Sequence, residues 1–122
     1  MNILVVEDNH HLSDLLSKYF KLSKHLCHVA PGGQIALSLM QTKMYDLVFL
    51  DLAMPGFTGY DVIESLKKSD TIKNQKIIVL TAVSLEQKDI DFLLNQGVHV
   101  VLQKPIPLNQ LITYVSQNFP IP

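Results

Sequence analysis

The sequence predicts an α/β domain with a doubly wound, five-stranded parallel sheet and helices on both faces. Short apolar runs rich in Val, Ile and Leu alternate along the chain with segments whose apolar residues recur every three or four positions. The runs are typical of strands buried on both faces of a parallel sheet, and the longer pattern is typical of amphipathic helices. Regular alternation with short connections builds a parallel sheet with right-handed crossovers.

Five apolar runs are the predicted strands, and four of them run directly into polar residues. The strands are expected at Ile3–Val6, about Cys27–Ala30, Leu47–Leu50, Ile77–Leu80 and Val98–Leu102. Five strands connected in this way fit the flavodoxin-like order 2-1-3-4-5, in which the first and third strands lie side by side. Ligands of such sheets bind beyond the carboxyl ends of the strands, where the strand order reverses.

Five segments with helical spacing lie between and after these strands. The predicted helices are His11–Ser23 with Leu12, Leu15, Leu16 and Tyr19 inward; one after Pro31 with Ile35, Leu39 and Met40; one from near Thr58 to Asp70; one with Ile90, Leu93 and Leu94 ending at Gly97; and one from Leu108 to about Asn118. A glycine just after the last periodic residue is a common helix C-terminus. Each strand is therefore followed by one helix.

Length and composition favour a single globular domain, residues 1–122, in which 120–122 form a tail or the start of a linker. The net charge is −1 and every basic residue is a lysine, so arginine, the usual bidentate reader of guanine and phosphate, is missing. We therefore expect no direct binding of nucleic acid. No apolar run approaches the ~20 residues that cross a bilayer, which predicts no membrane contact. The single cysteine, Cys27, fits a reducing compartment, so the expected location is cytoplasmic.

The polar residues at the strand ends indicate a phosphate site that uses a divalent cation. Glu7 and Asp8 follow the first strand, Asp51 the third, Thr81 the fourth, and Lys104 the fifth. Three carboxylates so close together repel one another unless a cation is present, and oxygen ligands suit Mg²⁺, with Mn²⁺ as an alternative. Any one of these acids is explained as a strand-end turn residue. Three on adjacent strands together with a lysine favour a functional site.

Four short motifs in this order resemble the receiver domain of response regulators in two-component signalling. They are the pair Glu7-Asp8, the stretch from Asp51 to Gly59, Thr81-Ala82, and Lys104-Pro105. Each motif alone is common, whereas all four at strand ends across the whole chain are specific. The resemblance implies a signalling module that catalyses only its own phosphorylation and dephosphorylation, and so is not an enzyme in the usual sense.

The resemblance also implies a role for each matching residue. Asp51 would accept a phosphoryl group from a phosphohistidine on a sensor histidine kinase or a histidine phosphotransfer protein. Asp8, Asp51 and the backbone carbonyl of Ala53 would bind Mg²⁺, and Glu7 would act through metal-bound water. Lys104 would contact a phosphoryl oxygen.

The hydroxyl of Thr81, beside the small Ala82, would turn to the phosphoryl group as the switch. The Lys104–Pro105 peptide bond is expected to be cis, which would turn the chain so that the ammonium points into the crevice.

Phosphorylation is expected to change the surface of the fourth helix, fifth strand and fifth helix. That change would control a downstream partner or a fused output domain, and phosphorylation-dependent dimerisation is a further expectation. Leu85 and Phe92, seven residues apart, would either form an apolar patch on the fourth helix or be covered by a neighbouring loop. Many relatives carry an aromatic residue where this chain has Val101, so we expect the loop after the fourth strand to transmit the signal.

The lifetime of the phosphoryl group is expected to depend on Ala53 and Val83. These residues lie two positions after Asp51 and Thr81, where polar side chains of other family members can position the water that hydrolyses the acyl phosphate. Both residues are apolar here. A comparatively long-lived phosphoryl group is therefore expected.

Three other functions compete with this interpretation. An aspartyl phosphatase usually carries a second acid two residues after its nucleophile, and that position is Ala53 here. A flavodoxin-like cofactor binder needs a Gly-rich or Ser/Thr-rich phosphate loop after the first strand, where Glu7-Asp8 would repel a phosphate. A degenerate receiver that binds partners without phosphorylation is disfavoured by the intact acids, Thr81 and Lys104. The cognate kinase and the output target are not identified by the sequence.

Overall fold

The five strands form one parallel sheet in the order β2-β1-β3-β4-β5, which confirms the predicted topology. The computed structural model describes residues 1–119; the predicted tail or linker at 120–122 lies outside this range. The strands are β1 Asn2–Val6, β2 Leu26–Ala30, β3 Leu47–Leu50, β4 Lys76–Thr81 and β5 Val100–Gln103. The helices are α1 His10–Leu22, α2 Gly33–Thr42, α3 Gly59–Lys68, α4 Gln87–Gln96 and α5 Leu108–Asn118, with a short 3₁₀ helix, η1, at Ile72–Asn74.

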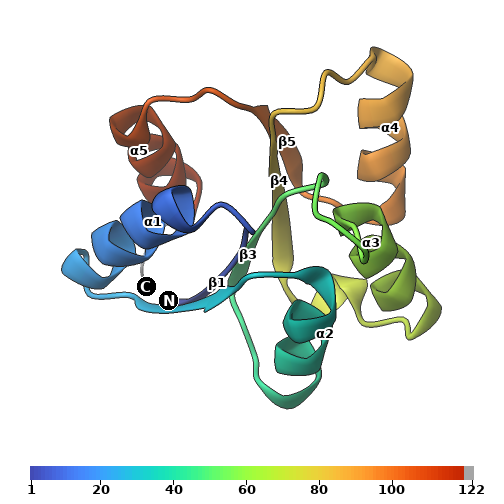
Figure 1. Cartoon of the computed structure of the whole chain (residues 1–122), viewed down its shortest axis with the longest axis horizontal. Coiled ribbons are helices and arrows are strands. Elements are labelled where there is room, and N and C mark those ends of the chain that lie inside the picture. The colour runs from blue at the N-terminus through green and yellow to red at the C-terminus, as the bar shows by residue number, and fades with distance from the viewer. Residues whose placement is uncertain (120–122) are drawn as a thin grey trace.

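The helices cover both faces of the sheet, with α1 and α5 on one face and α2, α3 and α4 on the other (Figure 1). Two hydrophobic clusters correspond to these two layers, one on each side of the sheet. Every residue of β3 is buried, as expected for a central parallel strand. Within residues 1–119, no helix is both long enough and apolar enough to span a membrane.

The fifth strand begins two residues later than predicted. Val98 was expected to open it, but its amide donates to the carbonyl of Leu93 at the end of α4, 3.2 Å away. Gly97 lies between them with φ +116°, a conformation that glycine adopts readily. The predicted C-terminal glycine is therefore confirmed, and Val98 still belongs to the helix end.

Three of the predicted inward helix faces include an exposed residue, namely Leu15 in α1, Ile35 in α2 and Leu94 in α4. In α1 the buried positions include Leu16 and Phe20, whereas Leu15 is exposed. Phe20 stacks on Phe49 of β3 with ring centroids 5.4 Å apart, a tertiary contact that local periodicity does not reveal. In α2 the small Ala36 is buried, whereas Ile35 is exposed.

The contact of α3 with the end of β3 depends on glycine at position 59. A Cβ added at Gly59 would lie 2.3 Å from the carbonyl oxygen of Asp51, far inside van der Waals contact. The Gly59 amide donates to the carbonyl of Leu52 at 3.2 Å. Thr58 and Asp61 form a capping box at the start of the helix, with the Thr58 amide 2.8 Å from Asp61 Oδ2. These contacts fix the backbone that carries Asp51.

Replacing Gly59 with alanine is expected to lower the free energy of unfolding by about 1–3 kcal/mol, because the added methyl group clashes with backbone. Urea denaturation measures this loss. Gly32→Ala is the matched control, since a Cβ there has no heavy atom within 4 Å. The control should cost no more than about 1 kcal/mol, the scale of a less favourable N-cap residue. Equal losses in the two variants would contradict the argument.

Candidate functional site

The register of the sheet brings the ends of β1 and β3 together. Val6 pairs with Leu50, so Glu7 and Asp51 each follow a paired strand end by one residue. The Asp51 amide donates to the carbonyl of Val6 at 3.1 Å, and the Glu7 amide donates to the carbonyl of Ala30 at 3.0 Å. The backbone of both acids is therefore held by sheet hydrogen bonds.

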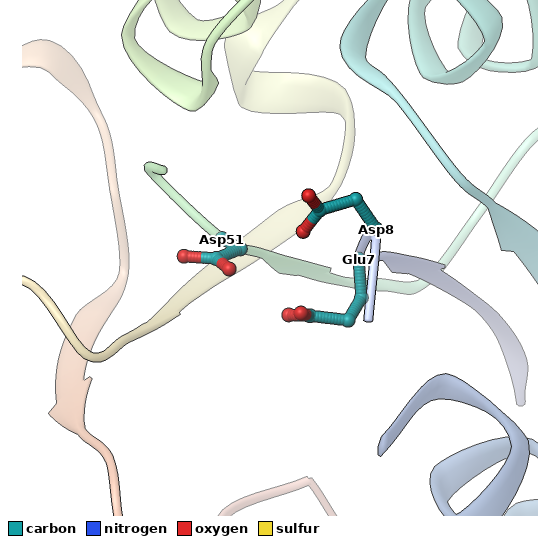
Figure 2. A group of neighbouring side chains, drawn as sticks. All are labelled: Glu7, Asp8 and Asp51. Carbon is teal, nitrogen blue, oxygen red and sulfur yellow. The ribbon is translucent and has the colours of Figure 1, made fainter. Parts of the chain in front are cut away.

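Three carboxylates gather at this edge, as the sequence predicted. One oxygen atom from each of Glu7, Asp8 and Asp51 lies within 4.8 Å of the other two. Figure 2 shows these side chains extending from the ends of β1 and β3. Glu7 and Asp51 are buried, whereas Asp8 is more exposed. An all-oxygen cluster with one accessible member is suited to a hard divalent cation that keeps bound water.

Lys104 places its ammonium between the two buried acids. Its Nζ lies 2.8 Å from Glu7 Oε2 and 3.3 Å from Asp51 Oδ2. The Lys104 amide donates to the carbonyl of Thr81 at 2.8 Å, which continues the ladder between β4 and β5. The Lys104–Pro105 bond is cis, the isomer expected from the sequence. Three ionised carboxylates against one ammonium leave an excess of two negative charges.

The pKa of Glu7 is raised above its ordinary value of 4.5. Burial is the main cause, and the negative charge of Asp51 adds to it. The hydrogen bond from Lys104 and the one from the Asn9 amide, 3.2 Å from Glu7 Oε1, act in the opposite direction. One ammonium is therefore not enough to offset the cost of burying Glu7 beside Asp51.

Asp51 is also tied to the loop that follows it. The Ala53 amide donates to Asp51 Oδ1 at 3.2 Å, while Asp51 Oδ2 faces Lys104. The two carboxylate oxygens thus have different partners. The side chain of Ala53 is exposed beside this site and offers no acid or base.

Thr81 is completely buried at the end of β4. Its hydroxyl oxygen accepts a hydrogen bond from the Val83 amide at 3.2 Å, which ties it to the loop before α4. Ala82 and Val83 are both exposed. A polar side chain at position 83 would therefore be free to reach solvent near the site.

The predicted helical patch of Leu85 and Phe92 is only half present. The helix α4 begins at Gln87, so Leu85 lies in the preceding loop and packs against the core. Phe92 is 53% exposed and lines a shallow groove with Tyr60 and Ile63 of α3. Leu85 therefore does not share a helical face with Phe92, because α4 begins two residues after it.

Gln103 is a contributor that the sequence analysis missed. Its side-chain Nε2 donates to the carbonyl of Thr81 at 2.9 Å and lies 3.3 Å from the carbonyl of Lys104. The one feature of the sequence that pointed to Gln103 was its polar character directly before Lys104. Its importance becomes apparent only once the register pairs Gln103 with Thr81.

Fold and site together define a receiver-type α/β domain, with an acidic cluster and a lysine at the point where the strand order reverses. The family model described as "Response regulator receiver domain" matches residues 3–116. The chain belongs to this family, whose members are generally signalling modules of two-component systems and not metabolic enzymes.

Curated relatives cover nearly the whole chain. An uncharacterised 14.6 kDa protein of Leptolyngbya boryana is 32% identical over 96% of this chain and 88% of its own length. The probable transcriptional regulator ycf29 of Porphyra purpurea is 28% identical over 94% of this chain, which spans 54% of that protein.

Solved receiver structures have the same fold. The receiver domain of Francisella response regulator 1452 has a TM-score of 0.84 and 26% identity, covering 95% of this chain and 93% of that one. The response regulator TrrA of Thermotoga maritima has a TM-score of 0.78 and 29% identity, covering 95% and 96%.

The raised pKa of Glu7 predicts a pH dependence of stability in metal-free buffer. The folded state keeps a proton on Glu7 that the unfolded chain releases near pH 4.5, so the stabilising contribution is present below that pH. It is lost as the pH rises through the folded-state pKa. The free energy of unfolding of Glu7→Gln should therefore fall less than that of wild type between pH 4.5 and neutrality. Chemical denaturation across this range, with a chelator present, makes the comparison, and identical pH profiles would refute the assignment.

Proposed function

We propose that Asp51 accepts a phosphoryl group from a phosphohistidine on a sensor histidine kinase or a histidine phosphotransfer protein, in a reaction that depends on Mg²⁺. One observation carries the proposal. The buried carboxylate of Asp51 lies 3.3 Å from the ammonium of Lys104, inside a cluster of three acids at the end of β3. A nucleophile, a fixed positive charge and a set of cation ligands are thus combined in one place.

The donor set fits a hard divalent cation. Three carboxylate oxygens within 4.8 Å of one another suit Mg²⁺, with Mn²⁺ as a substitute, and the excess negative charge favours its binding. Asp8, Asp51 and the backbone carbonyl of Ala53 would hold the ion, and Glu7 would contact its bound water. When bound, the cation neutralises charge on the phosphoryl oxygens.

The residues of the chain supply positioning and charge. A carboxylate oxygen of Asp51 forms a bond to phosphorus while the phosphorus–nitrogen bond to the histidine breaks, and the electron pair of that bond returns to the imidazole. Since the transition state is loose, catalysis comes mainly from alignment and electrostatic stabilisation. Lys104, a compact point charge, would contact one phosphoryl oxygen of the product. The hydroxyl of Thr81 would donate to another.

The switch would start at the hydrogen bond that Thr81 now makes with the Val83 amide. Turning the hydroxyl toward the phosphoryl group releases this amide, and the loop before α4 can move. The altered surface of α4, β5 and α5 would then control a downstream protein, a fused output domain or a second phosphorylated copy. We place this event in the cytoplasm and assign residues 1–122 to one receiver domain.

The relatives support this function. The Thermotoga maritima TrrA structure was determined in complex with Mg²⁺ and BeF, and the relative from Arabidopsis thaliana is named a two-component response regulator. An aspartyl phosphatase remains the less favoured alternative, since the methyl group of Ala53 cannot serve as a general acid.

Incubation with a small-molecule acyl phosphate should add one phosphoryl group to the wild-type chain, measured by intact mass. The adduct should need Mg²⁺ and disappear on chelation, because the acidic cluster otherwise repels the anionic donor. Asp51→Asn removes the nucleophile and should give no adduct, whereas Asp46→Asn, an acid outside the cluster, should behave as wild type. An adduct that persists in Asp51→Asn would refute the assignment of the acceptor.

The phosphoryl group should be lost faster after a polar substitution at either of the two flanking positions. Ala53→Asn and Val83→Glu place groups that can orient a hydrolytic water, so each should shorten the lifetime of the adduct several-fold. Decay is followed by mass after removal of the donor. Ala53→Val and Val83→Leu are the apolar controls. An unchanged decay rate in both polar variants would show that neither position affects hydrolysis of the phosphoryl group.

A further inference from the structure

Gln103 forms a bridge between the two residues proposed to contact the phosphoryl group. Its amide nitrogen is 2.9 Å from the carbonyl oxygen of Thr81 and 3.3 Å from that of Lys104. The carbonyl of Thr81 also accepts the Lys104 amide at 2.8 Å. Two donors, both from the end of β5, therefore converge on one carbonyl of β4.

The position of this bridge argues against a role in packing. Gln103 is exposed, and it belongs to neither of the hydrophobic clusters formed by residues 1–119. Its side chain donates hydrogen bonds to the backbone carbonyls of Thr81 and Lys104. A side chain that contributes little buried apolar area can still fix backbone geometry through directional hydrogen bonds.

We propose that Gln103 is a positioning residue, which holds the backbone of Thr81 and Lys104 at a fixed spacing so that the hydroxyl and the ammonium meet the same phosphoryl group. This inference rests on the proposed function of Asp51. Thr81 must exchange its hydrogen bond with the Val83 amide for one with the phosphoryl group. With its carbonyl anchored by Gln103 and Lys104, Thr81 makes this exchange by rotating its side chain while the strand end stays in place.

The same bridge links the switch to the loop that follows β5. Through its second bond, to the carbonyl of Lys104, Gln103 also holds the start of the segment that leads to α5. The connection runs through hydrogen bonds at the ends of the strands. It requires no rearrangement of the buried side chains beneath them.

The test uses Gln103→Met, which keeps the length of the side chain and removes the donor. The maximal rate of phosphorylation by an acyl phosphate should fall about 3- to 10-fold, the scale expected when the two hydrogen bonds of an exposed side chain are lost. The apparent affinity for Mg²⁺ should not change, because the carboxylates are untouched. Gln110→Met, an exposed glutamine on α5, is the matched control and should keep the wild-type rate.

A second variant separates hydrogen bonding from packing. Gln103→Ala also removes the aliphatic part of the side chain and should lower the rate no further than Gln103→Met. In ¹⁵N spectra, the Val83 amide should shift on addition of Mg²⁺ and beryllofluoride in wild type, and this shift should be smaller in both Gln103 variants. A rate in Gln103→Met equal to wild type, or a loss confined to Gln103→Ala, would overturn the inference.

The two proposals fail in distinguishable ways. If wild type and Gln110→Met take up neither phosphoryl group nor beryllofluoride, the proposed function fails and the role of Gln103 fails with it. If both proteins take them up and Gln103→Met does so equally well, only the role of Gln103 is lost. A parallel fall in Mg²⁺ affinity and thermal stability would show a general structural role instead.

Discussion

The ammonium of Lys104 between Glu7 and Asp51 is the interaction on which the site depends. It joins the ends of three strands, β1, β3 and β5, that are far apart in the sequence. Burying the two carboxylates costs free energy. Removing one member of a buried group of paired charges leaves the remaining charges uncompensated. Burial keeps the pKa of Glu7 raised even with Lys104 in contact. The three carboxylates also outnumber the one ammonium, and this excess of negative charge favours a further cation.

The backbone around Asp51 is correspondingly rigid. Sheet hydrogen bonds fix it on the side of β1, and the close approach of Gly59 fixes it on the side of α3. The Ala53 amide then orients one carboxylate oxygen. Such preorganisation matters for phosphoryl transfer, in which alignment and charge account for most of the catalysis. In the loop between β4 and α4, by contrast, the hydroxyl of Thr81 accepts from a single amide, that of Val83.

Most of the fold and the centre of the site could be predicted from the sequence, because the apolar runs are local signals and each ends at its polar residue. Glu7, Asp51 and Lys104 were found in this way. Features that depend on tertiary contacts were not. The burial of Phe20 requires knowing that it stacks on Phe49, and the covering of Leu85 requires knowing where α4 begins. The importance of Gln103 follows only from its pairing with Thr81.

Two kinds of residue, charged and uncharged, lie at this edge of the sheet. The carboxylates and Lys104 form a charge cluster that is suited to binding a cation and a phosphoryl group. Thr81 and Gln103 lie on neighbouring strands beside this cluster and carry no charge. In the proposed switch, Thr81 would respond to the phosphoryl group without changing the charge balance, and Gln103 would hold its backbone in place. A hydroxyl is suited to this response because it can accept from the Val83 amide in one state and donate to an oxygen in the other. Under the proposed function, the chemistry of transfer would stay constant while the residues beside Thr81 set how the event is transmitted.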